Sequence, residues 1–221
     1  MEVAQEYNLL GQKLGPKGRQ VRDRLLAAAR GLMASQPMSA PTLTAVTAAA
    51  DVRLTSVYRY YADAGALYIA AMEPLRAQMA PLIALLKQRW RKGAEYAEAL
   101  RFAEQHFSYW RDRRGALFLR NSLAEGGDVR FIALRTEWAF PLYRALAEKL
   151  AAAHGRAVGE DDMAIAGVVL SGMERTATLA LQHWEEEGHA SHSAVLRHAG
   201  KQQAAVARIV TTLLRQDYLE S

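Results

Sequence analysis

The chain has 221 residues, of which 51% are hydrophobic and 23% are charged, and its net charge is +5. This length and composition can bury a sizeable core as one large domain or two small ones. The absence of cysteine excludes disulfides, thiol catalysis and zinc sites built from cysteine.

Positive charge is concentrated towards the N-terminus. Residues 1–61 contain eight basic but only four acidic residues, whereas the rest of the sequence is nearly balanced. Such an excess can attract a polyanionic partner, although small basic excesses often serve only solubility. A nucleic-acid-binding segment is therefore expected in the N-terminal part of the chain.

The sequence predicts no membrane-spanning segment. The first residues include Glu2 and Glu6 and lack the apolar core of a signal peptide. The best apolar run, Ala164 to Met173, is shorter than a membrane span. We expect a cytoplasmic protein without a membrane partner.

Alanine-rich runs and few alternating β-branched residues favour an all-α protein. Residues 1–16 are predicted to form a flexible basic arm that leads into Lys17 and Arg19. A helix is expected from about Gln20 to Ser35. A short loop that contains two prolines then separates this helix from the next.

The segment from Leu43 to Tyr61 predicts two short helices joined by a tight turn. Thr42 can cap the first helix, over Leu43 to Ala50, because its hydroxyl can accept hydrogen bonds from N–H groups at the helix start. Asp51 occupies the turn, where the backbone must enter the left-handed region. This is the pattern of a helix-turn-helix, whose second helix enters the major groove of DNA.

The second helix is expected from about Leu54 to Tyr61, with two chemically different faces. Val57, Tyr60 and Tyr61 fall together at helical spacing and form the packing face. The opposite face carries hydroxyl, phenol and guanidinium groups, from Thr55, Tyr58 and Arg59, with Leu54 and Ser56 at its flanks. These groups suit phosphate oxygens and base edges, although an alanine-rich hairpin with three tyrosines is also compatible with an ordinary packing unit.

The segment Val52-Arg-Leu-Thr-Ser-Val-Tyr-Arg-Tyr-Tyr61 resembles the turn and recognition helix of the TetR family of bacterial transcriptional regulators. The resemblance also includes the preceding helix and the start of the next one, and it covers about residues 17–72. It implies a DNA-binding domain of three helices over 17–72, with a connecting helix, and an all-helical effector-binding and dimerisation domain over 73–221. It also implies repression that a small molecule relieves.

The resemblance implies that the DNA contacts come from the second helix, its turn and the two preceding helix starts. The expected contact residues are Thr42, Arg53, Leu54, Thr55, Ser56, Tyr58 and Arg59, together with Lys17 and Arg19. Three positions depart from the family pattern, because Asp51 replaces a glycine, Arg53 a capping serine and Ala64 a lysine. The last two departures put the cap and particular phosphate contacts in doubt.

The remaining sequence is predicted to be helical. A fourth helix, from about Ala64 to Met72, is expected to stop near Pro74. The later helices are expected over about 75–92, 95–112, 115–124, 128–153, 161–187 and 190–216. Pro81 and Pro141 fall inside two of them and predict kinks or local breaks.

Aromatic residues recur on successive helices in the middle of the chain. Such side chains can line a pocket for an apolar or aromatic ligand, and the candidates are Trp90, Phe107, Trp110, Phe118, Phe131 and Trp138. An aromatic residue at helical spacing more often packs in a core. The expectation of a ligand pocket therefore depends mainly on the family resemblance.

The last two helices carry long apolar stripes that include Val168, Val169 and Ile209. Two such helices from each of two chains can form a four-helix bundle, so we expect a homodimer. Burial of the stripes within one chain is the alternative. Three histidines, His183, His189 and His192, fit an exposed loop better than a metal site.

The favoured function is an effector-responsive repressor that binds a palindromic operator in double-stranded DNA as a homodimer. A small apolar or aromatic ligand would release it. The alternative is a DNA-binding protein of the same fold without a small-molecule effector, acting through protein partners or in chromosome organisation. We find no nucleophile elbow, phosphate loop, metal cluster or paired acidic motif, and therefore expect neither an enzyme nor a bound cofactor or metal.

Overall fold

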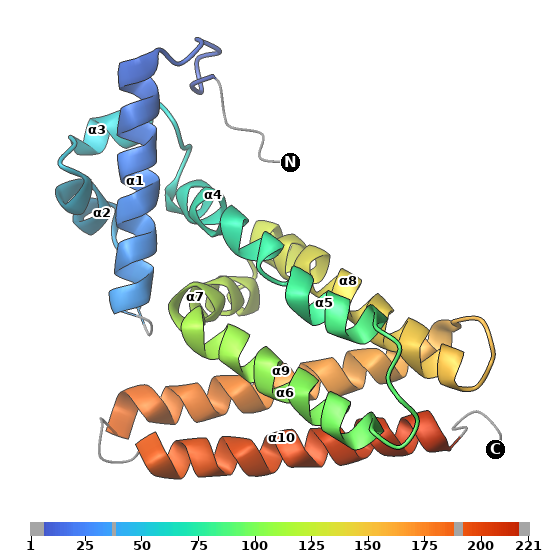
Figure 1. Cartoon of the computed structure of the whole chain (residues 1–221). Coiled ribbons are helices and arrows are strands. Elements are labelled where there is room, and N and C mark those ends of the chain that lie inside the picture. The colour runs from blue at the N-terminus through green and yellow to red at the C-terminus, as the bar shows by residue number, and fades with distance from the viewer. Residues whose placement is uncertain (1–6, 37–38, 188–191, 217–221) are drawn as a thin grey trace. The chain divides into compact units, whose positions relative to one another are not determined.

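The computed structural model describes residues 7–36, 39–187 and 192–216 (Figure 1). Its secondary structure is helical, which confirms the prediction of an all-α protein for these residues. The helices are α1 (Pro16–Ser35), α2 (Leu43–Ala50), α3 (Leu54–Val57), α4 (Ala64–Ala77), α5 (Ala80–Lys87), α6 (Glu95–Asp112), α7 (Arg114–Glu125), α8 (Val129–Ala153), α9 (Glu160–Glu187) and α10 (His192–Arg215). His189 lies outside the described residues, and the described part contains no group of acidic residues and histidines that could hold a metal ion.

The chain divides into two compact units. The first contains Met1–Ala77 together with Gly115–Ile132, and the second contains Gln78–Arg114 together with Ala133–Ser221. The first unit thus includes all of the expected DNA-binding segment and a piece of chain from the middle of the sequence.

In the first unit, α1 packs against both α2 and α4, and α2 packs against α3. The core side chains of α1 recur at intervals of four residues, at Leu25, Ala29 and Met33, because this spacing places them on one helix face. Helix α1 begins at Pro16, earlier than predicted, since proline lacks an N–H and suits the first turn of a helix. The predicted stop of α4 near Pro74 is wrong by one turn, because the helix continues to Ala77.

In the second unit, α6 packs against α9 and α10, which also pack against each other (Figure 1). Helix α5 packs on α6. The single helix predicted over about 75–92 is wrong, because α4 ends at Ala77 and Pro81 occupies the first turn of the separate helix α5. Helix α8 continues through Pro141.

The predicted apolar stripes of the last two helices divide between core and surface. Met173, Ala180 and Val210 are buried within the second unit. Val168 and Ile209 are exposed, to 75% and 52% of their surface. Burial within one chain therefore accounts for only part of each stripe.

Two apolar stretches, Ala64–Lys87 and Glu160–Gln182, have the length and composition that would suffice to cross a membrane. The prediction that no apolar segment is as long as a membrane span is therefore wrong for these two stretches. Length and composition are weak evidence, because core helices of soluble proteins satisfy the same test. Residues 64–87 also belong to two helices rather than one.

His106 of α6 is buried among aromatic side chains and provides a test of the packing of the second unit. Its ring lies 6.3 Å from that of Phe102 and 6.4 Å from that of Trp110, measured between centroids. Burial removes the ring from water and lowers the pKa of His106 to about 4.

We expect this histidine to make the protein less stable in mild acid. The unfolded state has the higher pKa, near 6.5, and so binds more protons than the folded state between pH 6.5 and 4. The unfolding free energy should therefore fall as the pH decreases through this range, by up to about 1.4 kcal/mol per pH unit. Denaturant unfolding at pH 7.0, 6.0 and 5.0 measures this slope. If the unfolding free energy of His106→Leu fell equally steeply with decreasing pH, His106 would not be the cause of the acid sensitivity.

Candidate nucleic-acid interface

The turn between α2 and α3 has the local geometry that the sequence predicts. The Thr42 side chain accepts a hydrogen bond from the Ala45 N–H at 3.1 Å, which confirms Thr42 as the cap of α2. Asp51 has φ 51° and ψ 53°, in the left-handed region. Its N–H donates to the Ala48 carbonyl at 3.2 Å, and the Val52 N–H donates to the Thr47 carbonyl at 3.0 Å. These bonds close the turn and direct the chain into α3.

Helix α3 is shorter than predicted. It is α-helical only from Leu54 to Val57, and the expected extension to Tyr61 is wrong. The N–H groups of Arg59 and Tyr60 donate to the carbonyls of Ser56 and Val57, three residues back, so the chain tightens as the helix ends. Arg53 precedes the helix and forms no side-chain cap bond, as its departure from the family pattern suggested.

Residues 53–61, which we call the recognition segment, have two predicted faces that differ in burial. Val57, Tyr60 and Tyr61 are buried, which confirms the predicted packing face. Tyr58 is 52% exposed. The other outward residues, Arg53, Leu54, Thr55 and Arg59, are also exposed, and Ser56 is half-buried. The exposed face thus offers hydroxyl, phenol and guanidinium groups on a firmly packed segment.

Tyrosines anchor this segment in the first unit. Burial raises the pKa of Tyr61 to about 12, so its phenol remains neutral at ordinary pH. The Tyr68 hydroxyl of α4 donates to the Pro41 carbonyl, and this bond joins α4 to the residues just before α2. The anchoring role of Tyr68 could not be predicted from the sequence, because its hydrogen-bond acceptor is 27 residues away.

The N-terminal arm also contacts the recognition segment. Tyr7 and Lys13 form an isolated antiparallel bridge, and the Leu9 N–H donates to the Arg59 carbonyl at 2.9 Å. Leu14 is buried, and Arg19 donates to its carbonyl at 2.5 Å. The described part of the predicted flexible arm is therefore a loop with defined hydrogen bonds. Lys17 and Arg19 remain exposed at the start of α1.

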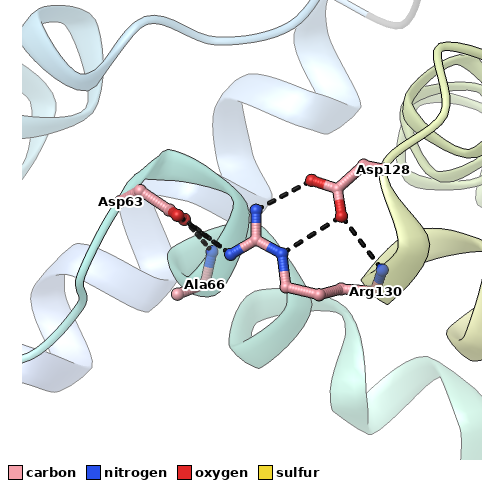
Figure 2. Close-up of polar contacts among 4 residues, drawn as sticks. All are labelled: Asp63, Ala66, Asp128 and Arg130. Atoms are coloured by element: carbon pink, nitrogen blue, oxygen red, sulfur yellow. Dashed lines mark hydrogen bonds and ion pairs between the residues drawn. The ribbon is translucent and has the colours of Figure 1, made fainter.

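A charged cluster holds the start of α4 (Figure 2). The Asp63 carboxylate accepts the Ala66 N–H at 2.8 Å and both of its oxygens accept Arg130 Nη1, at 2.9 and 3.0 Å. The other side of the Arg130 guanidinium donates to both oxygens of Asp128. The hydrogen bond from the Ala66 N–H lowers the pKa of Asp63 below its usual value, and the bond and charge of Arg130 lower it further.

Gly65 leaves room for this cluster. A Cβ at position 65 would lie 2.5 Å from Arg130 Nη2, which is closer than van der Waals contact allows. The glycine therefore permits the guanidinium to approach the first turn of α4. The cluster is solvent-exposed, so each ion pair contributes little by itself to stability.

The predicted ligand-binding aromatics occupy different environments. Phe118 and Phe131 are buried in the first unit, and Trp110 and Trp138 are buried in the second. Phe107 lines a cavity of about 20 Å³ between α6, α9 and α10, which is room for one water molecule. Trp90 lines a separate, larger groove. Phe107 and Trp90 thus border different cavities of the second unit.

The fold is shared with a known class of regulators. The structure matches the crystal structure of a TetR-family transcriptional regulator from Streptomyces coelicolor, with a TM-score of 0.57 over 90% of each chain and 19% sequence identity. No protein-family model matches the sequence, and no curated protein matches it significantly. The chain therefore has the fold of a TetR-family regulator. Its helix-turn-helix segment also resembles that family in sequence.

The left-handed conformation of Asp51 should be relieved by glycine. A residue with a Cβ is strained in this region by about 1–2 kcal/mol, and asparagine and aspartate are less strained than most. We expect Asp51→Gly to raise the unfolding free energy by up to about 1 kcal/mol, because the greater freedom of glycine in the unfolded chain offsets part of the gain. Asp51→Ala, the control, should lower it. Urea unfolding that ranks Ala above Gly would contradict the role of this backbone conformation.

Proposed function

We propose that the protein is a homodimeric, DNA-binding transcriptional regulator, and specifically a repressor that a small molecule releases. The supporting observation is the division of the recognition segment into a buried face and an exposed polar face. This segment directly follows the tight turn at Asp51, in a chain whose fold matches that of a TetR-family regulator. The proposal assigns the exposed face to the major groove of double-stranded DNA.

The exposed side chains divide by the contacts they can make. Thr55 and Tyr58 carry hydroxyl groups that suit phosphate oxygens. Arg59 has a guanidinium that can bind phosphate or the paired acceptors of guanine. The flanking contacts are proposed for Thr42, Arg53, Leu54 and Ser56, and phosphate contacts for Lys17 and Arg19 beside the arm.

The exposed parts of α9 and α10 support the homodimer. Val168, Leu179 and Ile209 are large apolar residues that face solvent in a single chain. Covering them with the same helices of a second chain would form a four-helix bundle and bury this surface. Two recognition segments related by two-fold symmetry would then fit an operator with inverted half-sites.

The proposed effector acts on the position of α4. A ligand in the second unit would shift the residues from Ala66 to Met72 and change the separation of the two recognition segments in the dimer. The cluster of Asp63, Arg130 and Asp128 holds the start of this helix within the first unit. A regulator of this kind would act in the cytoplasm, where the bacterial chromosome is accessible.

One observation favours the second candidate function, a DNA-binding protein of the same fold that acts through protein partners or in chromosome organisation. The cavity beside Phe107 has room for one water molecule rather than an aromatic ligand. A cavity of this size is too small for an aromatic effector, so a regulator without another effector site would need a protein partner as its signal.

Substitutions on the exposed face should weaken DNA binding without unfolding the protein. An operator can be selected by the protein from a random pool of duplexes, and affinities measured at two salt concentrations for this operator and for a random duplex. If Arg59 binds guanine, Arg59→Ala should weaken the binding free energy for the operator by about 1–3 kcal/mol. Tyr58→Phe should weaken binding to both duplexes if its hydroxyl binds phosphate.

The matched control is Arg101→Ala, because Arg101 is an exposed arginine of α6 in the second unit. It should leave both affinities and the melting temperature unchanged. Unchanged affinity in both test variants, on both duplexes, would show that the wrong face or the wrong segment has been assigned.

An acidic residue in the proposed dimer interface should separate the two chains. Ile209→Asp or Val168→Asp would bury a charge without a partner, which costs more than the apolar contact that it replaces. Light scattering should report a dimer for the natural protein and a monomer or insoluble protein for each variant. Val158→Asp, at a half-exposed loop position, is the control and should remain dimeric. A natural protein that is monomeric at micromolar concentration would refute the interface.

A further inference from the structure

The second unit contains a groove of about 1,080 Å³. It is bordered by the end of α5, the segment between α5 and α6, the start of α6, the C-terminal part of α8 and Leu214 of α10. This volume is slightly larger than the range of about 300–1,000 Å³ that is typical of small-molecule pockets. All of its lining residues belong to the second unit, so the groove is separate from the recognition segment.

The groove is lined by more cationic than acidic side chains. Its cationic side chains are Lys87, Arg89, Arg91, Lys92 and Lys149. The structure shows no ion pair between any of these five and a carboxylate of the described residues. Clustered cations at a concave surface create a positive potential that attracts anions.

The two carboxylates of the groove are already engaged by other arginines. Glu148 binds Arg144 at 2.8 Å. Glu95 accepts the Gly93 N–H at 2.9 Å and binds Arg215 at 3.1 Å. The Gly93 bond and Arg215 lower the pKa of Glu95 to about 2, so this carboxylate stays ionised and paired. Neither arginine lines the groove, so both groove carboxylates are paired outside its cation set. Glu98, which pairs with Arg101, also acts electrostatically on Lys149 but forms no ion pair with it.

Lys149 is the most constrained of these cations. Its ammonium lies 4.3 Å from the centre of the Trp90 ring and donates to the Gln88 carbonyl at 2.8 Å. Trp90 is itself held by a hydrogen bond from its indole N–H to the Leu85 carbonyl. Burial lowers the pKa of Lys149 to about 8, because the charged form is partly removed from water. An ammonium has three donors, so two remain for an anion.

The groove also has an apolar wall. Leu86, Ala145 and Leu214 line it together with the indole of Trp90. We propose that this groove binds an organic anion in which a phosphate, sulfonate or carboxylate group is joined to an apolar body. Lys149 and the exposed cations hold the anionic group, and the apolar wall holds the body. Binding of the anion in this groove does not require that the protein binds DNA.

The test uses two fluorescent probes with nearly the same aromatic body. Anilinonaphthalene sulfonate carries a negative charge, and phenylnaphthylamine is its neutral counterpart. The full chain should bind the sulfonate saturably and about tenfold more tightly than the neutral probe, a difference of about 1.4 kcal/mol. Pyrophosphate, which has charge without an apolar body, should displace the sulfonate.

Substitutions that remove cations inside and outside the groove test whether the probe binds there. Arg91→Gln/Lys92→Gln should weaken sulfonate binding by about tenfold, or about 1.4 kcal/mol. Arg30→Gln/Lys201→Gln removes the same charge from exposed positions outside the groove and should leave binding unchanged. Lys149→Met keeps the apolar stem, removes the ammonium, and should also weaken binding, with circular dichroism used to check the fold.

Four results would overturn the proposal. They are the absence of saturable binding, equal binding of the neutral probe, equal weakening by the two double variants, and failure of pyrophosphate to compete. The first would exclude the site, the second would indicate a purely apolar surface, and the last two would place the probe elsewhere. None of these results depends on DNA binding, so they test the groove separately from the proposed regulator function.

Discussion

The burial of Val57, Tyr60 and Tyr61 is the constraint on which the proposed DNA-binding surface depends. Helix α3 has only four helical residues, and a helix of this length is not stable by itself. Its orientation is therefore fixed by the three side chains that anchor it in the first unit. With these three side chains buried, Thr55 of α3 and Tyr58 and Arg59 just after it are left exposed.

Several weaker contacts hold the elements around this anchored segment. The Leu9 N–H binds the Arg59 carbonyl where the recognition segment ends, and Tyr68 binds the Pro41 carbonyl before α2. Arg130 joins the first turn of α4 to Asp128. Exposed ion pairs of this kind contribute little to stability and are weakened by salt. They suit a part of the structure that must be held in place but also be able to move, as the proposed release from DNA requires.

Structure that neighbouring residues determine could be predicted from the sequence. The cap at Thr42, the left-handed Asp51 and the buried face of α3 follow from helix spacing and from the chemistry of single residues. Contacts between residues that are distant in sequence could not be predicted in this way. Arg130 and Asp63, for example, are 67 residues apart. The pairing of basic residues is equally invisible in a sequence, so the groove cations that form no ion pair could not be predicted. The early end of α3 was missed because the hydrogen bonds that tighten it depend on packing rather than on local pattern.

The central claim is that the protein binds DNA through the exposed residues of the recognition segment. Hydrogen–deuterium exchange of the full chain, with and without a duplex that it has selected from a random pool, tests this claim most directly. The account predicts that DNA slows exchange in the peptides that cover residues 42–61 and the start of α1. Slowed exchange confined to the second unit, with no change over residues 42–61, would contradict it.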